Sequence, residues 1–401
     1  MALLPVAEAL ASLLDGAEPR GTETVALAQA AGRVLSAPLH ALRTQPPFDA
    51  SAMDGYAVQA GDIASLPVRL KVIGQAPAGK QFTGTVCPGE CVRIFTGAPV
   101  PRGTDTVVIQ ENVRDLGDGE IEVVEPTSAG RNIRARGLDF KQDDLILDAG
   151  RVLDPAALSL IAAANHPGVE VLRAPLVAII ATGDELLPPG GNPGPDQIIA
   201  SNAYGVAAIV QSVGARVLDL GIAADRTEAI AALVAKALAA DADVIVTLGG
   251  ASVGDHDLVH RVLTDLGMDL AFWKIAMRPG KPLMFGRLGA SRCVGLPGNP
   301  VASLICSQIF LKPLVAKLGG HSYSHDMRTA ILDTAMAAND LRQDFVRAVA
   351  RETSEGLVVT PYLVQDSSML RTLAAANCAI VRAPFAPAID AGSACQVMML
   401  R

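Results

Sequence analysis

The chain has 401 residues and a formal net charge of -8 at pH 7; half of its residues are hydrophobic, but only 3% are aromatic. This length exceeds what one hydrophobic core supports, so we expect several domains with mainly aliphatic cores. The acidic balance argues against nucleic-acid binding, and no uninterrupted apolar run reaches the roughly 18–20 residues of a membrane-spanning helix.

Residues 1–40 are predicted to be helical, because Val6, Leu10, Leu13 and Leu14 recur at helical spacing. The segment lacks a basic start and a cleavage site, so we interpret it as an amphipathic helix and not as a signal peptide. The six cysteines form no CxxC pair and no zinc-binding spacing. They are typical of reduced core residues in a cytoplasmic protein.

Residues 41–145 contain short β runs separated by Gly and Pro, which predicts a small β-rich domain. Residues 146–174 are predicted to be helical, with Asp154 and Pro155 as the cap and first turn. We expect residues 1–40 and 146–174 to pack together as one discontinuous helical domain. The β-rich region would then be an insertion in it.

Strands and helices alternate across residues 175–326, which predicts a three-layer, doubly wound parallel α/β domain. The expected strands are LVAIIATG, ARVLDLG, DVIVTLGG and CVGLP. Asp225 is expected to cap the helix that follows the second of these strands. Residues 327–401 return to short β runs and are predicted to form a separate C-terminal β domain.

The first motif, Thr182 to Leu186 (TGDEL), follows a predicted buried strand. A glycine there allows close backbone approach, and the carboxylates of Asp184 and Glu185 can hold a cation. Mg²⁺ takes one or two carboxylates together with phosphate oxygens and water. The alternative interpretation is a simple turn in which the aspartate caps the next helix.

The second and third motifs point to an anion. The turn from Gly249 to Asp255 (GGASVGD) can form a nest of backbone amides, although a plain strand-to-helix turn is the alternative. Lys274, Arg278 and Lys281 place three cations within eight residues, which indicates an anion pocket or else a solvated charged edge. Because ligands bind outside the carboxyl ends of strands in such sheets, we expect one site for an anionic, phosphate-bearing substrate.

Outside this domain, Asp54 lies in a loop shaped by Pro, Phe, Met and Tyr, and Thr96 lies at a strand-to-loop edge. Capped turns are the alternative interpretation. His256 and His260 have a spacing found in zinc proteases, but Asp257 replaces the usual glutamate and no third ligand is evident, so we reject zinc catalysis.

Taken together, the motifs resemble the molybdopterin molybdenumtransferase family, the MoeA type, to which the gephyrin E domain also belongs. The resemblance extends over most of the chain in the order of the family. Its segments are PPFDASAMDGYAV (46–58), RIFTGAPVPRGTDTVVIQE (93–111), GRNIRARGLDF (130–140), ATGDEL (181–186), SN (201–202), TLGGASVGDHD (247–257), FWKIAMRPGKPLMFG (272–286) and GLPGNPVAS (295–303).

The resemblance implies insertion of molybdate, as substrate, into adenylylated molybdopterin with release of AMP. It also implies Mg²⁺ dependence and a homodimer of elongated four-domain subunits. In the family, the active cleft lies between the α/β domain of one subunit and the β-rich domain of the other. The catalytic positions then fall on Asp54, Asp139, Glu185, Asp225 and Lys274, with Glu185 and Asp225 as metal ligands.

The positions assigned to substrate binding, from the resemblance and the motifs together, are Thr96, Gly249, Gly250, Ser252, Gly254, Asp257, Arg278, Lys281, Pro297 and Pro300. The chain departs from the family at three places. Arg278 stands where Lys is common, Leu138 where Glu is usual, and Ala302 where a hydroxyl residue is frequent. Two other functions stay open: a non-catalytic molybdopterin-binding or scaffold protein, and an enzyme acting on a different pterin or nucleotide.

Overall fold

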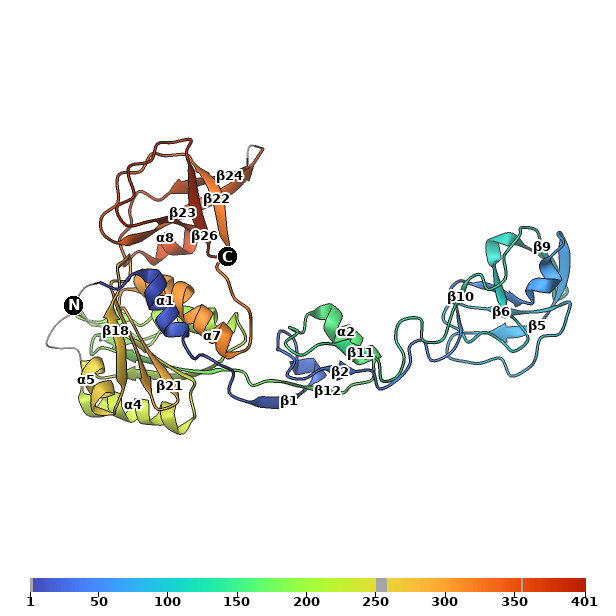
Figure 1. Ribbon diagram of the computed structural model, residues 1–401, viewed down its shortest axis with the longest axis horizontal. Coiled ribbons are helices and arrows are strands. Elements are labelled where there is room, and N and C mark those ends of the chain that lie inside the picture. Colours follow the sequence, from blue (N-terminus) through green and yellow to red (C-terminus); the bar gives the residue numbers. More distant parts are fainter. Residues whose placement is uncertain (1–2, 250–257, 355) are drawn as a thin grey trace. The chain divides into compact units, whose positions relative to one another are not determined.

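The computed structural model describes residues 3–249, 258–354 and 356–401 (Figure 1). By internal contacts the chain divides into two compact units. The first unit comprises Met1–Glu23, Gly32–Val34 and Glu170–Arg401, and the second comprises Thr24–Ala31 and Leu35–Val169. Each unit is described by itself, and the finer partition into four domains stays a prediction.

The first unit contains a six-stranded sheet. Its strands, in spatial order, are β16 (Arg216–Ala223), β13 (Leu176–Thr182), β17 (Val244–Leu248), β21 (Ser291–Leu296), β20 (Pro282–Leu288) and β18 (Asp269–Lys274). The first four are mutually parallel, as predicted, whereas β20 and β18 are antiparallel to their neighbours. The four predicted strands thus form the parallel part of the sheet, and two antiparallel strands extend it at this edge. The connections between β18, β20 and β21 are too short for the crossover that a parallel pair requires.

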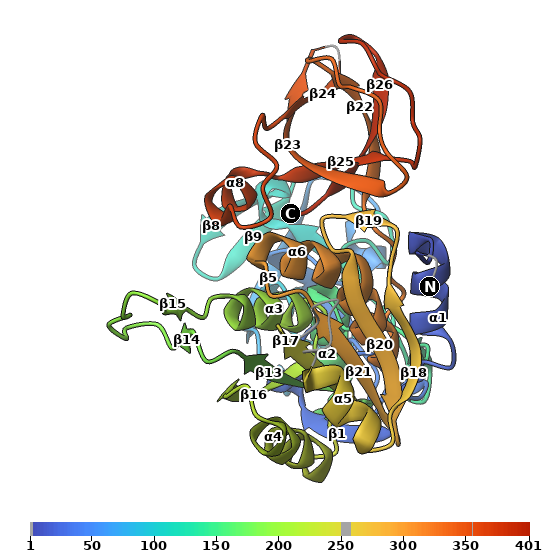
Figure 2. The same ribbon diagram turned by 90° about the vertical axis from the view of Figure 1, so that its left-hand side faces the viewer.

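Helices cover both faces of this sheet (Figure 2). One face carries α1 (Val6–Leu14), α3 (Asn202–Gln211), α6 (Pro300–Cys306), a π-helical turn (Ser307–Leu311) and α7 (Lys312–Leu318); the other carries α4 (Thr227–Ala239) and α5 (Leu258–Asp265). Alternate side chains of β13 enter the two cores: Val177 and Ile179 pack on one side, Ala178 and Ile180 on the other. The predicted three-layer α/β architecture is confirmed.

One expectation about helices was wrong. Residues 1–40 contain one α-helix, α1, which is followed by the strand β1 (Thr22–Ala26) and a 3₁₀ turn. Helix α1 packs into the core of the first unit. Helix α2 (Pro155–Ala163) packs on Ala41 and Phe140 in the second unit, and the discontinuous helical domain stays a prediction. Asp154 caps α2 as predicted, because its carboxylate accepts a hydrogen bond from the amide of Ala157.

The segment Pro300–Leu318 forms 19 consecutive helical residues with a mean hydropathy of 1.5. Within the described part of the chain, it is the one helix long and apolar enough to cross a membrane. The sequence analysis missed it because Gln308 and Lys312 interrupt the apolar run. However, 78% of its most apolar stretch is buried inside the fold, which is typical of a core helix.

The C-terminal part of the first unit is a small β barrel. Its sheet contains β19 (Met277–Arg278), β23 (Gln343–Thr353), β24 (Gly356–Pro361), β22 (Met327–Leu332), β26 (Ala394–Met399) and β25 (Cys378–Arg382) in that order. A further pairing between β23 and β25 closes the ring, and α8 (Leu370–Ala375) precedes β25. The predicted C-terminal β domain is confirmed. Strand β19 comes from the 275–281 loop of the α/β sheet, so the two folds share a backbone pairing.

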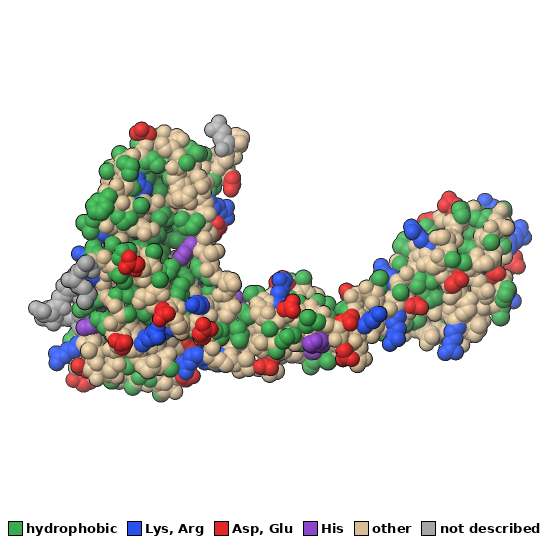
Figure 3. Space-filling model, in the orientation of Figure 1, with side chains coloured by type: hydrophobic (Ala, Val, Ile, Leu, Met, Phe, Trp, Pro, Cys, Tyr) green, Lys and Arg blue, Asp and Glu red, His purple; other side chains and the backbone are tan. Residues whose placement is uncertain are grey.

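The second unit is built on another six-stranded sheet, and its β-rich character was predicted. The strands are β7 (Thr106–Ile109), β4 (Gly55–Val58), β6 (Glu90–Ile94), β5 (Val68–Ala76), β9 (Glu120–Val123) and β8 (Val113–Gly117) in that order. Two-stranded pairings complete the fold of the whole chain: β1 with β12 (Gly168–Leu172), β2 (Leu39–His40) with β11 (Leu145–Leu147), β3 (Ala50–Ser51) with β10 (Ile133–Arg134), and β14 (Leu186–Leu187) with β15 (Ile198–Ile199). On the face drawn in Figure 3, positive and negative side chains are interspersed.

Candidate active site

A cavity of about 710 Å³ opens at the carboxyl ends of β13, β17 and β21 in the first unit. Its wall includes Thr182 and Gly183 after β13, Gly249 after β17, and Pro297 after β21. Because the strands are parallel, the turns that follow them gather at one edge, where such sheets bind ligands. The cavity therefore lies where the sequence motifs predicted a site.

The turn after β13 places a carboxylate against a glycine. Gly183 has a φ of +149°, and a Cβ built on it would lie 2.6 Å from a carboxylate oxygen of Glu185. The Glu185 side chain thus folds back over the turn, and both residues line the cavity. A side chain at position 183 would displace this carboxylate.

The loop after β16 brings a further carboxylate to the same place. The amide of Asp225 donates a hydrogen bond of 3.0 Å to the Asp184 carboxylate, and Asp225 lines the cavity. The pKa of Asp225 is raised, firstly by loss of hydration at the cavity wall and then by the negative charges of Asp184 and Glu185. The prediction that Asp225 caps α4 was wrong, because that helix begins at Thr227 and Arg226 occupies the capping position.

These carboxylates can accommodate Mg²⁺ with help from a substrate. Across the described ranges, no three Cys, His, Asp or Glu side chains form a ready-made metal cage. Mg²⁺ does not require one, since it is commonly held by one or two carboxylates with phosphate oxygens and waters completing the octahedron. Loss of hydration and then repulsion from Asp184 and Glu185 raise the pKa of Asp225, and a bound cation would favour its ionised form.

The turns after β17 and β21 approach one another closely. Gly249 has a φ of +94°, and a Cβ on it would lie 2.8 Å from the carbonyl oxygen of Thr182. A Cβ on Gly298 would lie 3.6 Å from the Cα of Gly249. Glycine is therefore required at position 249, where the backbones of two strand ends nearly touch. The other predicted residues of this motif, Gly250, Ser252, Gly254 and Asp257, lie outside the described residues.

The turn after β21 carries the two predicted prolines. Pro297 and Pro300 both line the cavity, and Asn202 fixes the turn by donating 2.8 Å to the carbonyl of Gly298. Ser368, from the C-terminal barrel, also lines the cavity. The sequence analysis missed the role of Ser368, because it lies in a loop of the barrel with no motif around it.

The cationic segment lies at the same edge of the sheet. Lys274 ends β18 and is paired in register with Pro282, which lines the cavity. The amide of Ile275 donates to the carbonyl of Lys281, so the two lysines lie near each other at the base of one loop. Neither lysine is among the described residues that line the cavity itself. They border it through Pro282.

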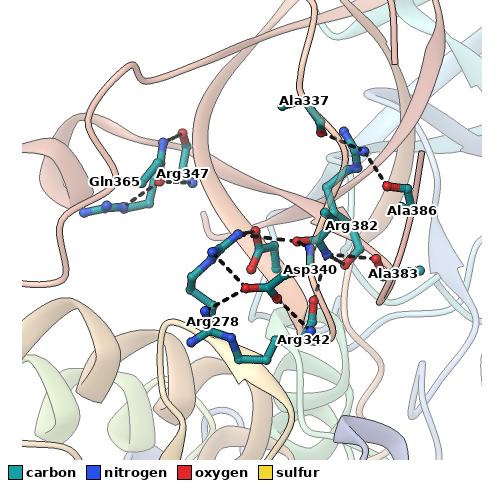
Figure 4. Close-up of polar contacts among 11 residues, drawn as sticks. Arg278, Ala337, Asp340, Arg342, Arg347, Gln365, Arg382, Ala383 and Ala386 are labelled. Carbon is teal, nitrogen blue, oxygen red and sulfur yellow. Dashed lines mark hydrogen bonds and ion pairs between the residues drawn. The ribbon is translucent and has the colours of Figure 1, made fainter. Parts of the chain in front are cut away.

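Arg278 points away from this edge toward the C-terminal barrel (Figure 4). Its guanidinium forms ion pairs with Asp344 and, at 3.3 Å, with Asp340. It also contacts Asn339. The side chain predicted to bind substrate is thus occupied by carboxylates of the barrel.

In the second unit, Asp54 and Thr96 form a tight pair. One carboxylate oxygen of Asp54 accepts hydrogen bonds of 2.7 Å from both the amide and the hydroxyl of Thr96. These bonds, the amide first, lower the pKa of Asp54. Next to them the Arg93 guanidinium lies over the rings of Tyr56 and Phe95, at 4.9 and 5.2 Å from their centres. Both predicted residues are therefore held in place, and the hydrogen bonds favour the ionised form of Asp54.

Three segments distant in sequence converge around this pair within the second unit. The amide of Gly97 donates to the carbonyl of Ser51, and Ser51 in turn is paired with Ile133. The amide of Arg136 donates to the Asp49 carboxylate. Asp139 follows in an exposed turn whose amide bonds to the carbonyl of Gln45. The motifs predicted in this unit thus form one connected surface.

Comparison with known proteins assigns the chain to a family. Models described as "MoeA N-terminal region (domain I and II)", "Probable molybdopterin binding domain" and "MoeA C-terminal region (domain IV)" match residues 4–165, 178–317 and 329–400. A molybdopterin molybdenumtransferase from Haemophilus influenzae is 36% identical, over 90% of both chains. One from Bacillus subtilis is 32% identical, over 99% of this chain and 94% of the relative.

The chain belongs to the molybdopterin molybdenumtransferase family. Two solved structures of molybdopterin biosynthesis MoeA proteins from Pyrococcus horikoshii agree, with TM-scores of 0.82 and 0.80 at 29% and 26% identity. They cover 100% and 99% of this chain, and this chain covers the whole of each. As a member of this family the protein is a transferase of molybdenum cofactor biosynthesis.

The acidic positions matched to the molybdenumtransferase family fall in both units. Glu185 and Asp225 line the cavity of the first unit, whereas Asp54 and Asp139 belong to the second. Arg278, which stands where the family commonly has Lys, forms ion pairs with Asp340 and Asp344 of the barrel. Leu138 is exposed and Ala302 is buried, so neither of these departures changes the cavity wall.

Proposed function

We propose that this protein inserts molybdate into adenylylated molybdopterin, releases AMP and requires Mg²⁺. The observation that carries the proposal is the group of carboxylates at the cavity wall, where Glu185 and Asp225 lie beside Asp184. A site that only bound a polyanionic pterin would gain little from placing negative charge against it. A metal-dependent cleavage of a phosphoanhydride needs that charge.

Glu185 and Asp225 would hold the metal, with substrate oxygens as further ligands. A bound Mg²⁺ would supply positive charge to offset that of the pyrophosphate. The chain itself supplies the walls: the backbone at Gly249 and the turn from Pro297 to Pro300 enclose the substrate on the sheet edge. A preorganised and partly dry wall strengthens each charge that acts inside it.

Lys274 and Lys281 would bind the anionic groups that border the cavity. Lys274 ends β18 and Lys281 lies across the base of the following loop, where a backbone hydrogen bond from Ile275 to Lys281 fixes the main chain. Molybdate is a dianion, and two lysines on neighbouring backbone segments match its charge. The lysines would therefore retain molybdate while the phosphoanhydride is cleaved.

Asp54, Thr96 and Asp139 would act on the same substrate from a second copy of the chain. All three lie in the second unit, where two hydrogen bonds from Thr96 hold Asp54 and lower its pKa. We therefore propose a homodimer with composite active sites, in the cytoplasm.

The test is an incubation of pure full-length protein with adenylylated molybdopterin, Mg²⁺ and molybdate, in which AMP is separated and quantified. The proposal predicts AMP release that depends on both molybdate and Mg²⁺. Tight binding of the adenylylated pterin without AMP release would instead establish a binding or scaffold function. Release from another adenylylated pterin, but not from molybdopterin, would establish a different substrate.

A further inference from the structure

Arg278 connects the loop between Lys274 and Pro282 to the C-terminal barrel. Its strand β19 pairs with β23 in parallel, and the register places Arg278 beside Asp344. Its two terminal nitrogens bind Asp344 and Asp340 (Figure 4). The contact therefore joins a loop at the edge of the cavity to a strand in the barrel wall.

Asp344 depends on this contact more than Asp340 does. Asp344 is only 7% exposed, and its Oδ1 atom has no hydrogen-bond partner among the described residues. Asp340 is already held by Arg342, through an ion pair of 2.9 Å and a backbone bond. Arg382, the cross-strand neighbour of Asp344, donates to the carbonyls of Ala337 and Pro387 instead. A buried carboxylate with one strong partner is costly to leave unpaired, so Asp344 holds Arg278 firmly.

The rest of the loop is fixed on its other sides. The amide of Ala276 donates to Leu4, and the carbonyl of Ala276 accepts from Gln343. Gly280 has a φ of +116°, and a Cβ on it would lie 2.4 Å from the sulfur of Cys306. Lys281 and Pro282 follow Arg278 closely in the chain, so we expect loss of the Arg278 contact to shift them relative to these fixed points. Pro282 forms part of the cavity wall.

We propose that Asp344 is a positioning residue: through Arg278 it holds the 274–282 loop so that Lys281 meets the anionic substrate at the cavity edge. This inference rests on the proposed function. In this inference Arg278 holds the loop through its ion pair with Asp344, and Lys274 and Lys281 bind the anion. It also gives the C-terminal barrel a part in the affinity for molybdate.

The experiment compares full-length Arg278→Met, Asp344→Ala and the double variant in the AMP-release assay, with molybdate titrated. Each single change removes the same tie between the loop and the barrel, so each is expected to raise the KM for molybdate about tenfold, less than the roughly 10²-fold that a full 1 Å misplacement can cost. The double variant is expected to be no worse than the worse single variant, because both changes break one contact. Thermal unfolding of the three variants should show the same lack of additivity.

Two further variants complete the test. Arg328→Met breaks an exposed ion pair with Asp326 in the same barrel, and it is expected to leave the KM for molybdate unchanged. Asp344→Asn keeps a hydrogen-bond acceptor for Arg278 and preserves the fold, and it is expected to raise the KM by less than Asp344→Ala does. A general loss of stability in the barrel would affect the Arg328 control as well.

Three results would overturn the inference. A raised KM in Arg278→Met with a wild-type KM in both Asp344 variants would mean that Arg278 binds the anion directly. Additive losses in the double variant would mean that the two residues act independently. A wild-type KM in all variants would mean that the Arg278–Asp344 ion pair does not affect molybdate binding. By contrast, a wild-type protein that releases no AMP would contradict the proposed function itself.

Discussion

The amide of Asp225 donates a 3.0 Å hydrogen bond to the carboxylate of Asp184, which ties the loop after β16 to the turn after β13. This bond brings together residues 41 positions apart and places Asp184 beside Glu185 and Asp225, which line the cavity. Carboxylates that the backbone holds close together repel one another, which lowers the stability of the folded protein. A bound cation offsets that cost, which is why we place Mg²⁺ there.

Glu185→Gln should weaken the Mg²⁺ dependence of turnover and leave the fold intact. The carboxylate lies over Gly183 at the cavity surface, so its replacement by an amide removes charge without opening the core. The concentration of Mg²⁺ that gives half-maximal AMP release is expected to rise about tenfold or more, as metal affinity does when a ligand is lost. An unchanged rate at limiting Mg²⁺ would reject this role for Glu185.

The affinity for Mg²⁺ should fall as the pH is lowered through the raised pKa of Asp225. Because the folded state holds this proton more tightly than the unfolded chain, ionisation above the ordinary aspartate pKa costs stability in the metal-free protein. Stability therefore decreases as the pH rises through that window, and Mg²⁺ should restore it. Thermal unfolding at several pH values, with and without Mg²⁺, measures this. Asp225→Asn should abolish this change of stability with pH. If the variant keeps the change, Asp225 is not the group responsible.

Lys274→Ala should cost about 10²–10³-fold in turnover, the usual loss when one preorganised charge at a developing anion is removed. The residue ends β18 opposite Pro282, at the edge of the cavity. Lys236→Ala is a suitable control, since Lys236 is exposed in the last turn of α4. Equal, near-wild-type rates for the two variants would exclude Lys274 from the site.

Gly280→Ala should destabilise the first unit, by about 1–3 kcal/mol as expected for overpacking of a tight core. The new methyl group would lie 2.4 Å from the sulfur of Cys306, in a backbone conformation with a φ of +116°. Gly61→Ala, where nothing lies within 4 Å of the new carbon, provides the control. Chemical denaturation of both variants is the measurement, and equal midpoints would show that the loop is not tightly packed there.

At limiting Mg²⁺, mixing Asp54→Asn subunits with Glu185→Gln subunits should restore activity that each variant alone loses. If the active site combines Asp54 of one copy with Glu185 of the other, each mixed dimer carries one intact site. Random exchange should then recover about a quarter of the wild-type rate, since half of the dimers are mixed. No recovery after exchange would mean that both residues act within one chain, and a monomeric mass by light scattering would exclude the composite site.

The sequence predicted those features that short segments determine. The strands that end in Gly-rich turns, the cap at Asp154 and the edge that carries Glu185 and Pro297 all follow from local pattern and strand polarity. What it could not predict depends on distant partners. Arg278 is paired with Asp344, 66 residues away, and α1 packs on the α/β sheet. The sequence pattern predicted that Asp225 caps the next helix, but its backbone amide donates to the carboxylate of Asp184.

The central claim is that this protein couples cleavage of the adenylylated pterin to the insertion of molybdenum. The most direct measurement quantifies AMP release and pterin-bound molybdenum in the same reaction, with pure full-length protein, adenylylated molybdopterin, Mg²⁺ and molybdate. The account predicts that both products appear together in equal amounts, and that neither appears without molybdate. Molybdenum insertion without AMP, or AMP release that ignores molybdate, would contradict it.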